Sequence, residues 1–239
     1  MNYLSKILKA AKEEGVLAIP IRIKNHLLLR VVPYFDIKFD RKYGVDTCGI
    51  KPLSDLDINS SQKLTAVHYE PTPVDAIRSI LKEIPIYHPD YTFVDFGSGK
   101  GRVLLLASEY PFGKIVGVEL SQSLHGIAES NIQIWDCPEQ KCFEVESLCI
   151  DASKYSLPDT PLVLFFFSPF SPSVLSCVID RIRESLLTNP RGIHIVYYGS
   201  RQDLIELFHT LNFSHKEVYF KRPLSAIGKY KGHLFSGNT

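Results

Sequence analysis

Short apolar segments alternate with helix-like segments from residue 72 onward, and this alternation restricts the possible folds most strongly. The apolar segments have the length of buried strands and lie at residues 92–96, 114–119, 146–150, 162–167 and 193–198. The segments between them have helical spacing and lie at residues 72–84, 102–109, 122–132, 172–187 and 201–211. Because strands covered on both faces are apolar throughout, the pattern predicts an α/β fold with a parallel sheet between two layers of helices.

Two details complete this prediction. Residues 213–221 and 233–236 have the pattern of a final antiparallel pair of strands. Thr72 is predicted to be the N-cap of the first helix, and Pro73 its first helical residue. Ligands of such sheets bind beyond the carboxyl ends of the strands, so we expect the functional residues in the loops that follow them.

The sequence DFGSGKG at residues 95–101 follows the first of these strands and opens a helix. Its glycines allow positive φ and a close approach of the backbone to a ligand. A dinucleotide fingerprint would need a third glycine where Arg102 stands, and a P-loop would need Ser or Thr after Lys100. Neither phosphate motif fits, and Asp95 favours a cationic or amine-bearing ligand over a pyrophosphate.

Acidic residues also end the next two strands. Glu119 lies 22 residues beyond Gly97, where a carboxylate can accept both hydroxyls of a ribose. Asp151, followed by Ala152, lies where a side chain could accept a hydrogen bond from an adenine amino group. Each acid alone is more often a solvated loop residue or a cap, but acids at three successive strand ends favour a nucleoside site.

Residues 65–239 resemble the class I, seven-stranded S-adenosylmethionine-dependent methyltransferases. The resemblance is carried by VDFGSGKG at 94–101, GVEL at 117–120, Asp151-Ala152 and FFSPF at 166–170. It implies a Rossmann-like sheet of order 3-2-1-4-5-7-6 with an antiparallel last-formed edge hairpin. It also implies S-adenosylmethionine as the cofactor, and it assigns parts of the cofactor to these residues. The glycine loop, with Asp95, Gly97, Ser98, Gly99 and Gly101, packs on the methionine part, Glu119 binds the ribose and Asp151 contacts the adenine. Leu120 and Ala152 also belong to the implied cofactor site.

A closer resemblance lies upstream, in HYEPTP at residues 68–73. This segment is similar to the loop that folds over the cofactor in seven-stranded protein-lysine methyltransferases, which include the non-SET histone enzymes. The matching positions are Tyr69, Glu70 and Thr72. Glu70 could assist deprotonation of an acceptor amine or bind the cofactor amino group, and the second role is favoured. Tyr197 and Tyr198 could line an acceptor pocket, although tyrosines that end a strand more often pack in the core.

The loop after the fourth strand reads SPFSP at residues 168–172. Amino-methylating members of the superfamily often have Asn or Asp here, followed by Pro-Pro and an aromatic residue. Pro169 and Phe170 match this pattern, whereas Ser168 departs from it because a hydroxyl is shorter and also donates. The resemblance predicts Ser168, Pro169 and Phe170 as catalytic residues, with Ser168 also at the cofactor. Alternatively, the loop is only a rigid turn before the next helix.

The N-terminal part is basic, with nine Lys/Arg against four Asp/Glu in residues 1–45. We predict helices at 3–14 and 19–32, a polar turn-like segment at 39–47 and a linker at 57–63. Residues 1–62 are therefore expected to form a basic helical extension or substrate lid, and residues 63–239 the cofactor-binding domain. The basic arm could make a peripheral membrane contact, touch a partner or face only water.

Composition excludes several classes of protein. A net charge of +1 gives no clear signal for nucleic acid. The five cysteines form no CxxC pair, so we expect neither a disulfide framework nor a metal site. Such cysteines are typical of free thiols in the cytoplasm. No apolar run approaches the ~20 residues that a transmembrane helix needs.

Three functions fit these observations. The first is methyl transfer to an amine nitrogen of a protein, in the manner of a lysine methyltransferase. The second is methylation of a small molecule at nitrogen or oxygen. The third is a non-catalytic module that binds S-adenosylmethionine, which the departure at Ser168 keeps open. The intact glycines and Glu119 favour an enzyme.

Overall fold

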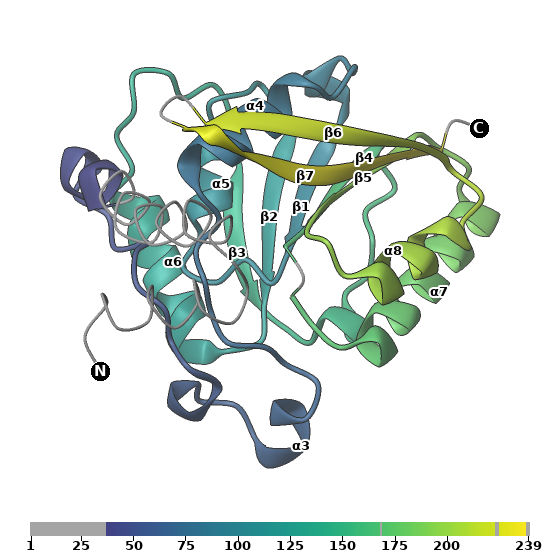
Figure 1. Cartoon of the computed structure of the whole chain (residues 1–239), viewed down its shortest axis with the longest axis horizontal. Coiled ribbons are helices and arrows are strands. Elements are labelled where there is room, and N and C mark those ends of the chain that lie inside the picture. The colour runs from purple at the N-terminus through teal and green to yellow at the C-terminus, as the bar shows by residue number, and fades with distance from the viewer. Residues whose placement is uncertain (1–36, 168, 223–224, 238–239) are drawn as a thin grey trace, which may run out of the picture.

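The computed structural model describes residues 37–167, 169–222 and 225–237, with the side chains of residues 219–231 excepted. Seven strands form one sheet of order β3-β2-β1-β4-β5-β7-β6 (Figure 1). They are β1 (Thr92–Phe96), β2 (Lys114–Glu119), β3 (Val145–Cys149), β4 (Leu162–Phe166), β5 (Ile193–Tyr198), β6 (Ser214–Arg222) and β7 (Ser225–Gly237). Strands β1 to β5 run parallel, and β7 pairs antiparallel with β5 and β6. The predicted sheet order and antiparallel edge hairpin are confirmed.

Helices cover both faces of the sheet. They are α4 (Val74–Lys82), α5 (Arg102–Ala107), α6 (Gln122–Ile134), α7 (Pro172–Thr188) and α8 (Gln202–His209). The short helix α3 (Ser60–Lys63) lies away from the sheet, and η1 (Leu53–Asp55), η2 (His88–Asp90) and η3 (Ala152–Lys154) are 3-10 turns. Figure 1 shows α5 and α6 on one side of the sheet and α7 and α8 on the other. This arrangement agrees with the doubly covered parallel sheet that the sequence predicts.

The apolar strands divide their side chains between two clusters. Phe93 and Phe165 pack with α4 and α5 on one face, and Phe96 and Phe166 pack with α7 and α8 on the other. Alternation between the faces follows from the two-residue period of a strand. All four rings are at most 1% exposed, so both faces of β1 and β4 lie in the core.

The segment before residue 48 belongs to this core. Residues 37–43 are helical, and Phe39 packs against Trp135, the residue after α6. The centroids of the two rings lie 5.7 Å apart. The prediction of a turn-like segment at 39–47 is therefore wrong for its first half. The physical reason is that Phe39 and Tyr43, one helical turn apart, both contact Trp135.

A buried ionic network holds this segment against α5. Arg102, whose side chain is 2% exposed, donates through Nε to Thr47 Oγ1 at 2.7 Å and lies 3.7 Å from the Asp40 carboxylate. Asp40 in turn accepts hydrogen bonds from the backbone N–H groups of Thr47 and Cys48, both at 2.8 Å. One guanidinium thus ties the first described segment to the start of α5.

Two further predictions about this region are wrong. The linker predicted at 57–63 contains α3, because Asn59 and Gln62 form a reciprocal capping box at its start. The helix predicted at 72–84 begins at Val74, with Pro73 as its N-cap and no side-chain cap. Thr72 is not the N-cap because the Pro73 carbonyl accepts the first bonds of the helix, from the N–H groups of Ala76 at 3.1 Å and Ile77 at 3.2 Å. The Thr72 carbonyl accepts instead from Arg102 at 3.2 Å.

The helices predicted at 3–14 and 19–32 lie outside the described residues. The domain boundary at residue 62 stays a prediction.

We expect Arg102→Met to lower the free energy of unfolding by about 3–5 kcal/mol, because it leaves buried polar partners of Arg102 uncompensated. Urea denaturation measures this change. The matched control is Arg183→Met on α7, whose side chain is 42% exposed and pairs with Asp180. That change should cost less than about 1 kcal/mol. Equal losses in the two variants would contradict a special role for the buried guanidinium.

Candidate functional site

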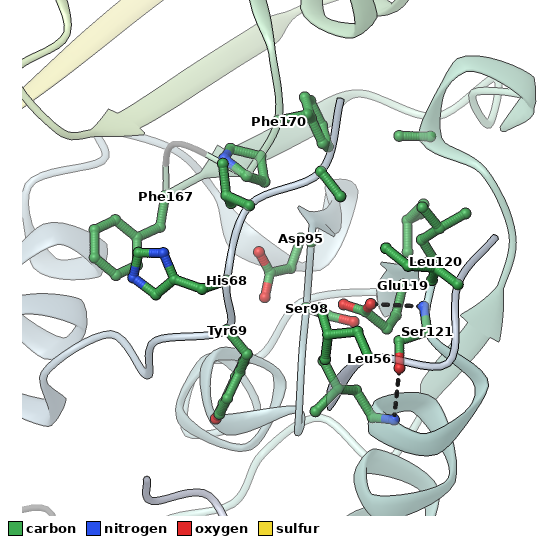
Figure 2. Close-up of a pocket in the computed structure, with 18 of the residues that line it drawn as sticks. Leu56, His68, Tyr69, Asp95, Ser98, Glu119, Leu120, Ser121, Phe167 and Phe170 are labelled. Carbon is green, nitrogen blue, oxygen red and sulfur yellow. Dashed lines mark hydrogen bonds between the residues drawn. The ribbon is translucent and has the colours of Figure 1, made fainter. Parts of the chain in front are cut away.

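A pocket opens at the carboxyl ends of β1, β2 and β4 (Figure 2). Its walls come from the loops that follow these strands and from residues 65–72, which we call the strap. The strap is held on both sides by antiparallel bridges, between Lys51 and Tyr69 and between Ala66 and Phe170. The pocket thus lies at the sheet edge where the sequence predicts functional residues.

The glycine loop is packed so tightly that its glycines have no room for a side chain. A Cβ on Gly97 would lie 2.5 Å from Cβ of Pro169, and one on Gly99 would lie 2.3 Å from the ring of Tyr69. Both glycines have positive φ. Loops distant in the sequence can therefore rest directly on this backbone. The predicted close approach of the same glycines to a ligand stays a prediction.

Asp95 and Ser98 present unpartnered polar atoms inside the pocket. Among the described residues, neither Asp95 Oδ2 nor Ser98 Oγ has a hydrogen-bond partner, and both atoms are buried. Figure 2 shows the Asp95 carboxylate pointing into the middle of the pocket. Buried polar groups are normally hydrogen-bonded, so these two atoms fit a ligand that supplies donors, including a cationic one.

Burial raises the pKa of the Asp95 carboxyl well above its usual range, and the nearby Glu119 carboxylate raises it further. Burial also raises the pKa of Glu119, although hydrogen bonds from the backbone N–H groups of Ser121 and Gly99 oppose this. Two carboxyls that both disfavour their charged form attract a cation, because a cation would offset their desolvation.

Glu119 also organises the backbone around the pocket. Its Oε2 accepts a hydrogen bond from the Gly99 N–H, and its Oε1 accepts one from the Ser121 N–H, both at 2.8 Å. The side chain therefore connects the glycine loop to the loop after β2. It lines the pocket with Leu120 beside it, as predicted.

The strap brings its three predicted residues to the pocket. Tyr69 donates from its hydroxyl to the Thr47 carbonyl at 2.7 Å, and burial raises the pKa of this hydroxyl. Thr72 is buried, whereas the Glu70 side chain is 53% exposed and lies 3.6 Å from the His68 imidazole. Glu70 thus has access to both solvent and pocket.

Asp151 and Ala152 line the opposite part of the pocket. Asp151 also caps η3, because its Oδ1 accepts hydrogen bonds from the Ser153 N–H at 2.9 Å and the Ser153 hydroxyl at 2.7 Å. The structure therefore gives this residue both a capping contact and a place at the pocket.

In the loop after β4, Pro169 and Phe170 line the pocket, whereas Ser168 lies outside the described residues. Phe170 packs edge-on against Phe166, with ring centroids 6.3 Å apart. The Ser171 N–H donates to the Thr65 carbonyl at 2.8 Å, which joins this loop to the strap. The loop therefore closes one wall of the pocket and is more than a turn before α7.

The sequence-based interpretation missed several lining residues: Leu56, Ile58, Gln62, His68 and Phe167. Leu56 and Ile58 alternate with polar neighbours, which was a weak signal of a segment with one buried side.

Tyr197 and Tyr198 do not line the pocket, and at 0% and 4% exposure they pack in the core. Of the two interpretations of these tyrosines, core packing is therefore the one that the structure shows, with the Tyr197 ring against Phe208 and the Tyr198 ring against Phe167.

Comparisons with known proteins agree with this geometry. The sequence model of one protein family, described as histone methylation protein DOT1, matches residues 50–154 of this chain. The match covers less than half of the chain. The matched range includes the strap, the glycine loop, Glu119 and Asp151. No curated protein matches the sequence.

The similar solved structures include methyltransferases. Precorrin-6y C5,15-methyltransferase from Geobacter metallireducens GS-15 has 17% identity and a TM-score of 0.50, over 69% of this chain and 87% of that chain. A SAM-dependent methyltransferase from Leishmania major has 12% identity and a TM-score of 0.48, over 68% and 70%. At 17% identity the precorrin-6y methyltransferase shows the fold alone, and the family match adds the activity.

The chain is a class I S-adenosylmethionine-dependent methyltransferase. S-adenosylmethionine is the cofactor of this methyltransferase. The Asp95 carboxylate oxygen in the pocket, which has no partner in the described part of the chain, suits the cationic methionine part of the cofactor. Among the described residues, no group of three or more His, Cys, Asp or Glu side chains could hold a metal ion. Over the same ranges, no helix has the length and apolarity to cross a membrane.

Gly99→Ala should weaken binding of S-adenosylhomocysteine at least about tenfold, because the new methyl group displaces Tyr69 from the glycine loop. Calorimetric titration measures the dissociation constant. Gly126→Ala on α6 is the matched control, since its Cβ would meet nothing within 4 Å. Wild-type affinity in Gly99→Ala would show that the contact between strap and glycine loop does not shape the site.

Affinity for S-adenosylmethionine should rise with pH through the pKa of Asp95 in the free protein. A raised pKa means that the free pocket favours the protonated carboxyl, so binding of a cation below that pKa releases a proton. Titrations in buffers of different ionisation enthalpy count this proton. Asp95→Asn should bind about tenfold or more weakly and lose this proton release. The same proton release in Asp95→Asn would assign it to another group.

Proposed function

We propose that this methyltransferase transfers a methyl group to an amine nitrogen of a protein, on a lysine-type side chain. The observation that carries the proposal is the charge of the pocket. Four carboxyl side chains line it, those of Glu70, Asp95, Glu119 and Asp151. The lining residue Arg102 is already engaged with Thr47 and Thr72. Three of these carboxyls are assigned to the cofactor below, so the acceptor meets chiefly the half-exposed Glu70, which favours a cationic acceptor over an anionic one.

The family match supports the same acceptor class. The family is described as a histone methylation protein, and the match covers the strap and the glycine loop, which form much of the pocket. Among the alternative acceptors, neutral or anionic small molecules would gain nothing from the half-exposed Glu70, whereas a cationic amine would.

We assign the cofactor contacts as follows. Asp95, Gly97, Ser98, Gly99 and Gly101 hold the methionine part, with the free Asp95 oxygen facing its ammonium group. Glu119 and Leu120 hold the ribose, and Asp151 and Ala152 hold the adenine. Tyr69 and Thr72 cover the cofactor from the strap.

The bound cofactor supplies a methyl group that is already activated, so the protein contributes mainly positioning and the exclusion of water. Pro169 and Phe170 form the wall along which the acceptor nitrogen enters. The catalytic role predicted for Ser168, which lies outside the described residues, stays a prediction. The buried Asp95 oxygen is better placed than Glu70 to take the cofactor amino group. Glu70 is therefore free to attract the protonated amine and, with His68 beside it, to accept its proton.

A labelling experiment tests the acceptor class. The protein is incubated with methyl-labelled cofactor and a cell lysate, and label is expected in protein as methyl-lysine. Glu119→Ala should reduce transfer at limiting cofactor by weakening ribose recognition, while Glu129→Ala, an exposed residue of α6, should transfer normally. Label only in small molecules would support the alternative acceptors. Label in neither fraction would contradict transfer to proteins and transfer to small molecules alike.

Two predictions about the whole chain stay predictions. The basic arm before residue 37 lies outside the described residues, so its peripheral contact with a membrane, a partner or water is untested. The cytoplasmic location is untested as well.

A further inference from the structure

Residues 53–64, which contain η1 and α3, form a segment that we call the flap. Both of its ends are fixed to the body by backbone hydrogen bonds. Before it, Lys51 and Tyr69 exchange N–H···O bonds of 3.0 and 2.9 Å, and after it Thr65 accepts from the Ser171 N–H at 2.8 Å. Figure 1 shows α3 extending away from the sheet, so the flap is a long excursion between two fixed points.

The flap faces the pocket with one side. Leu56, Ile58 and Gln62 line the pocket, and Leu56 is 6% exposed. In Figure 2 Leu56 lies next to Ser98 and near Ser121. The other side of the flap faces solvent, and Leu64 at the end of the flap is 85% exposed. The flap therefore forms the part of the pocket wall nearest the loop after β2.

One side chain fastens the middle of the flap to the body. Asp57 Oδ1 accepts hydrogen bonds from the Ser121 hydroxyl at 2.5 Å and the Ser123 hydroxyl at 2.9 Å. Asp57 Oδ2 accepts a third from the Ser123 backbone N–H at 2.9 Å. The two serines lie 64 and 66 residues from Asp57 in the chain, so this is a tertiary contact.

The contact suits a carboxylate in particular. Helix α6 has no acidic residue in its first turn, so Asp57 provides the negative charge that its N-terminus favours. The hydrogen bond from Ser121 is the main cause that lowers the pKa of Asp57, so the carboxylate stays charged near neutral pH.

Ser121 connects this contact to the cofactor site. Its backbone N–H donates to Glu119 Oε1 at 2.8 Å, and its hydroxyl donates to Asp57. The position of the loop at 119–123 therefore depends on both carboxylates. A shift of the flap would move its lining residues and the residue that orients Glu119.

We propose that Asp57 is a positioning residue that holds the flap closed over the adenosyl half of the cofactor and orients Glu119 through Ser121. Without this contact the flap opens, and the cofactor or its product leaves faster. The contact lies on the Glu119 side of the pocket and away from the loop at 169–170, so it controls binding and release and leaves the transfer step unchanged. This inference rests on the cofactor and on the proposed ribose contact of Glu119, and it is independent of the proposed acceptor.

The probe is S-adenosylhomocysteine, because its binding can be measured without an acceptor. We expect Asp57→Ala to weaken its affinity and to raise its dissociation rate by about tenfold, the effect of losing a charge-assisted hydrogen bond. In wild-type protein the ligand should slow amide hydrogen exchange over residues 53–64, and in Asp57→Ala this protection should disappear. Once an acceptor is known, KM for the cofactor should rise while kcat at saturation stays within about twofold.

Three controls separate positioning from general stability. Asp55→Ala removes a flap carboxylate that accepts a hydrogen bond from Ser54, and it should bind like wild type. Asp57→Asn keeps one acceptor oxygen and should recover part of the affinity. The Tm of unliganded Asp57→Ala should remain close to that of wild type, because Asp57 is an exposed residue.

Wild-type affinity and exchange protection in Asp57→Ala would overturn the proposal. A loss of equal size in Asp55→Ala, or a fall in unliganded Tm that accounts for the weaker binding, would also overturn it. Normal binding in Glu119→Ala would refute the ribose assignment and the link through Ser121. Failure of protein methylation would leave each of these binding results unaffected.

Discussion

The glycine loop after β1 is the place where the sheet, the strap and the loop after β4 meet. They meet there because Gly97 and Gly99 carry no side chains at the points of contact. The ring of Tyr69 occupies the space of a Cβ on Gly99, and Pro169 occupies that of a Cβ on Gly97. Any larger residue would separate these segments. Pocket shape therefore depends on two close contacts between residues that are distant in the chain.

Buried charge is the second constraint, and the protein uses it in two different ways. Arg102 is surrounded by acceptors from Thr47 and Thr72 and by the Asp40 carboxylate, so its charge is compensated within the described structure. Asp95 keeps one oxygen without a partner among the described residues, and its carboxyl disfavours ionisation. The first arrangement stabilises the fold, whereas the second leaves a binding preference for a cationic ligand.

The pocket is enclosed by segments that come before the sheet in the chain. The segment that ends near Cys48 supports the strap through Tyr69, and the flap adds Leu56 and its neighbours to the wall. The class I sheet supplies the cofactor loops, and the residues ahead of it complete the enclosure. This division explains why the family match begins at residue 50, well before β1.

The sequence by itself determined the strands, the order of alternation and the acids at the strand ends. These features are local, because a buried parallel strand must be apolar and a tight turn must carry glycine. The sheet order came from the resemblance to a family. Only the tertiary structure decided the role of residues 39–64, where Phe39 enters the core and Asp57 reaches Ser121. Polar contacts over such separations leave no periodic pattern in the sequence, so the segment looked like a turn and a linker until its partners were in place.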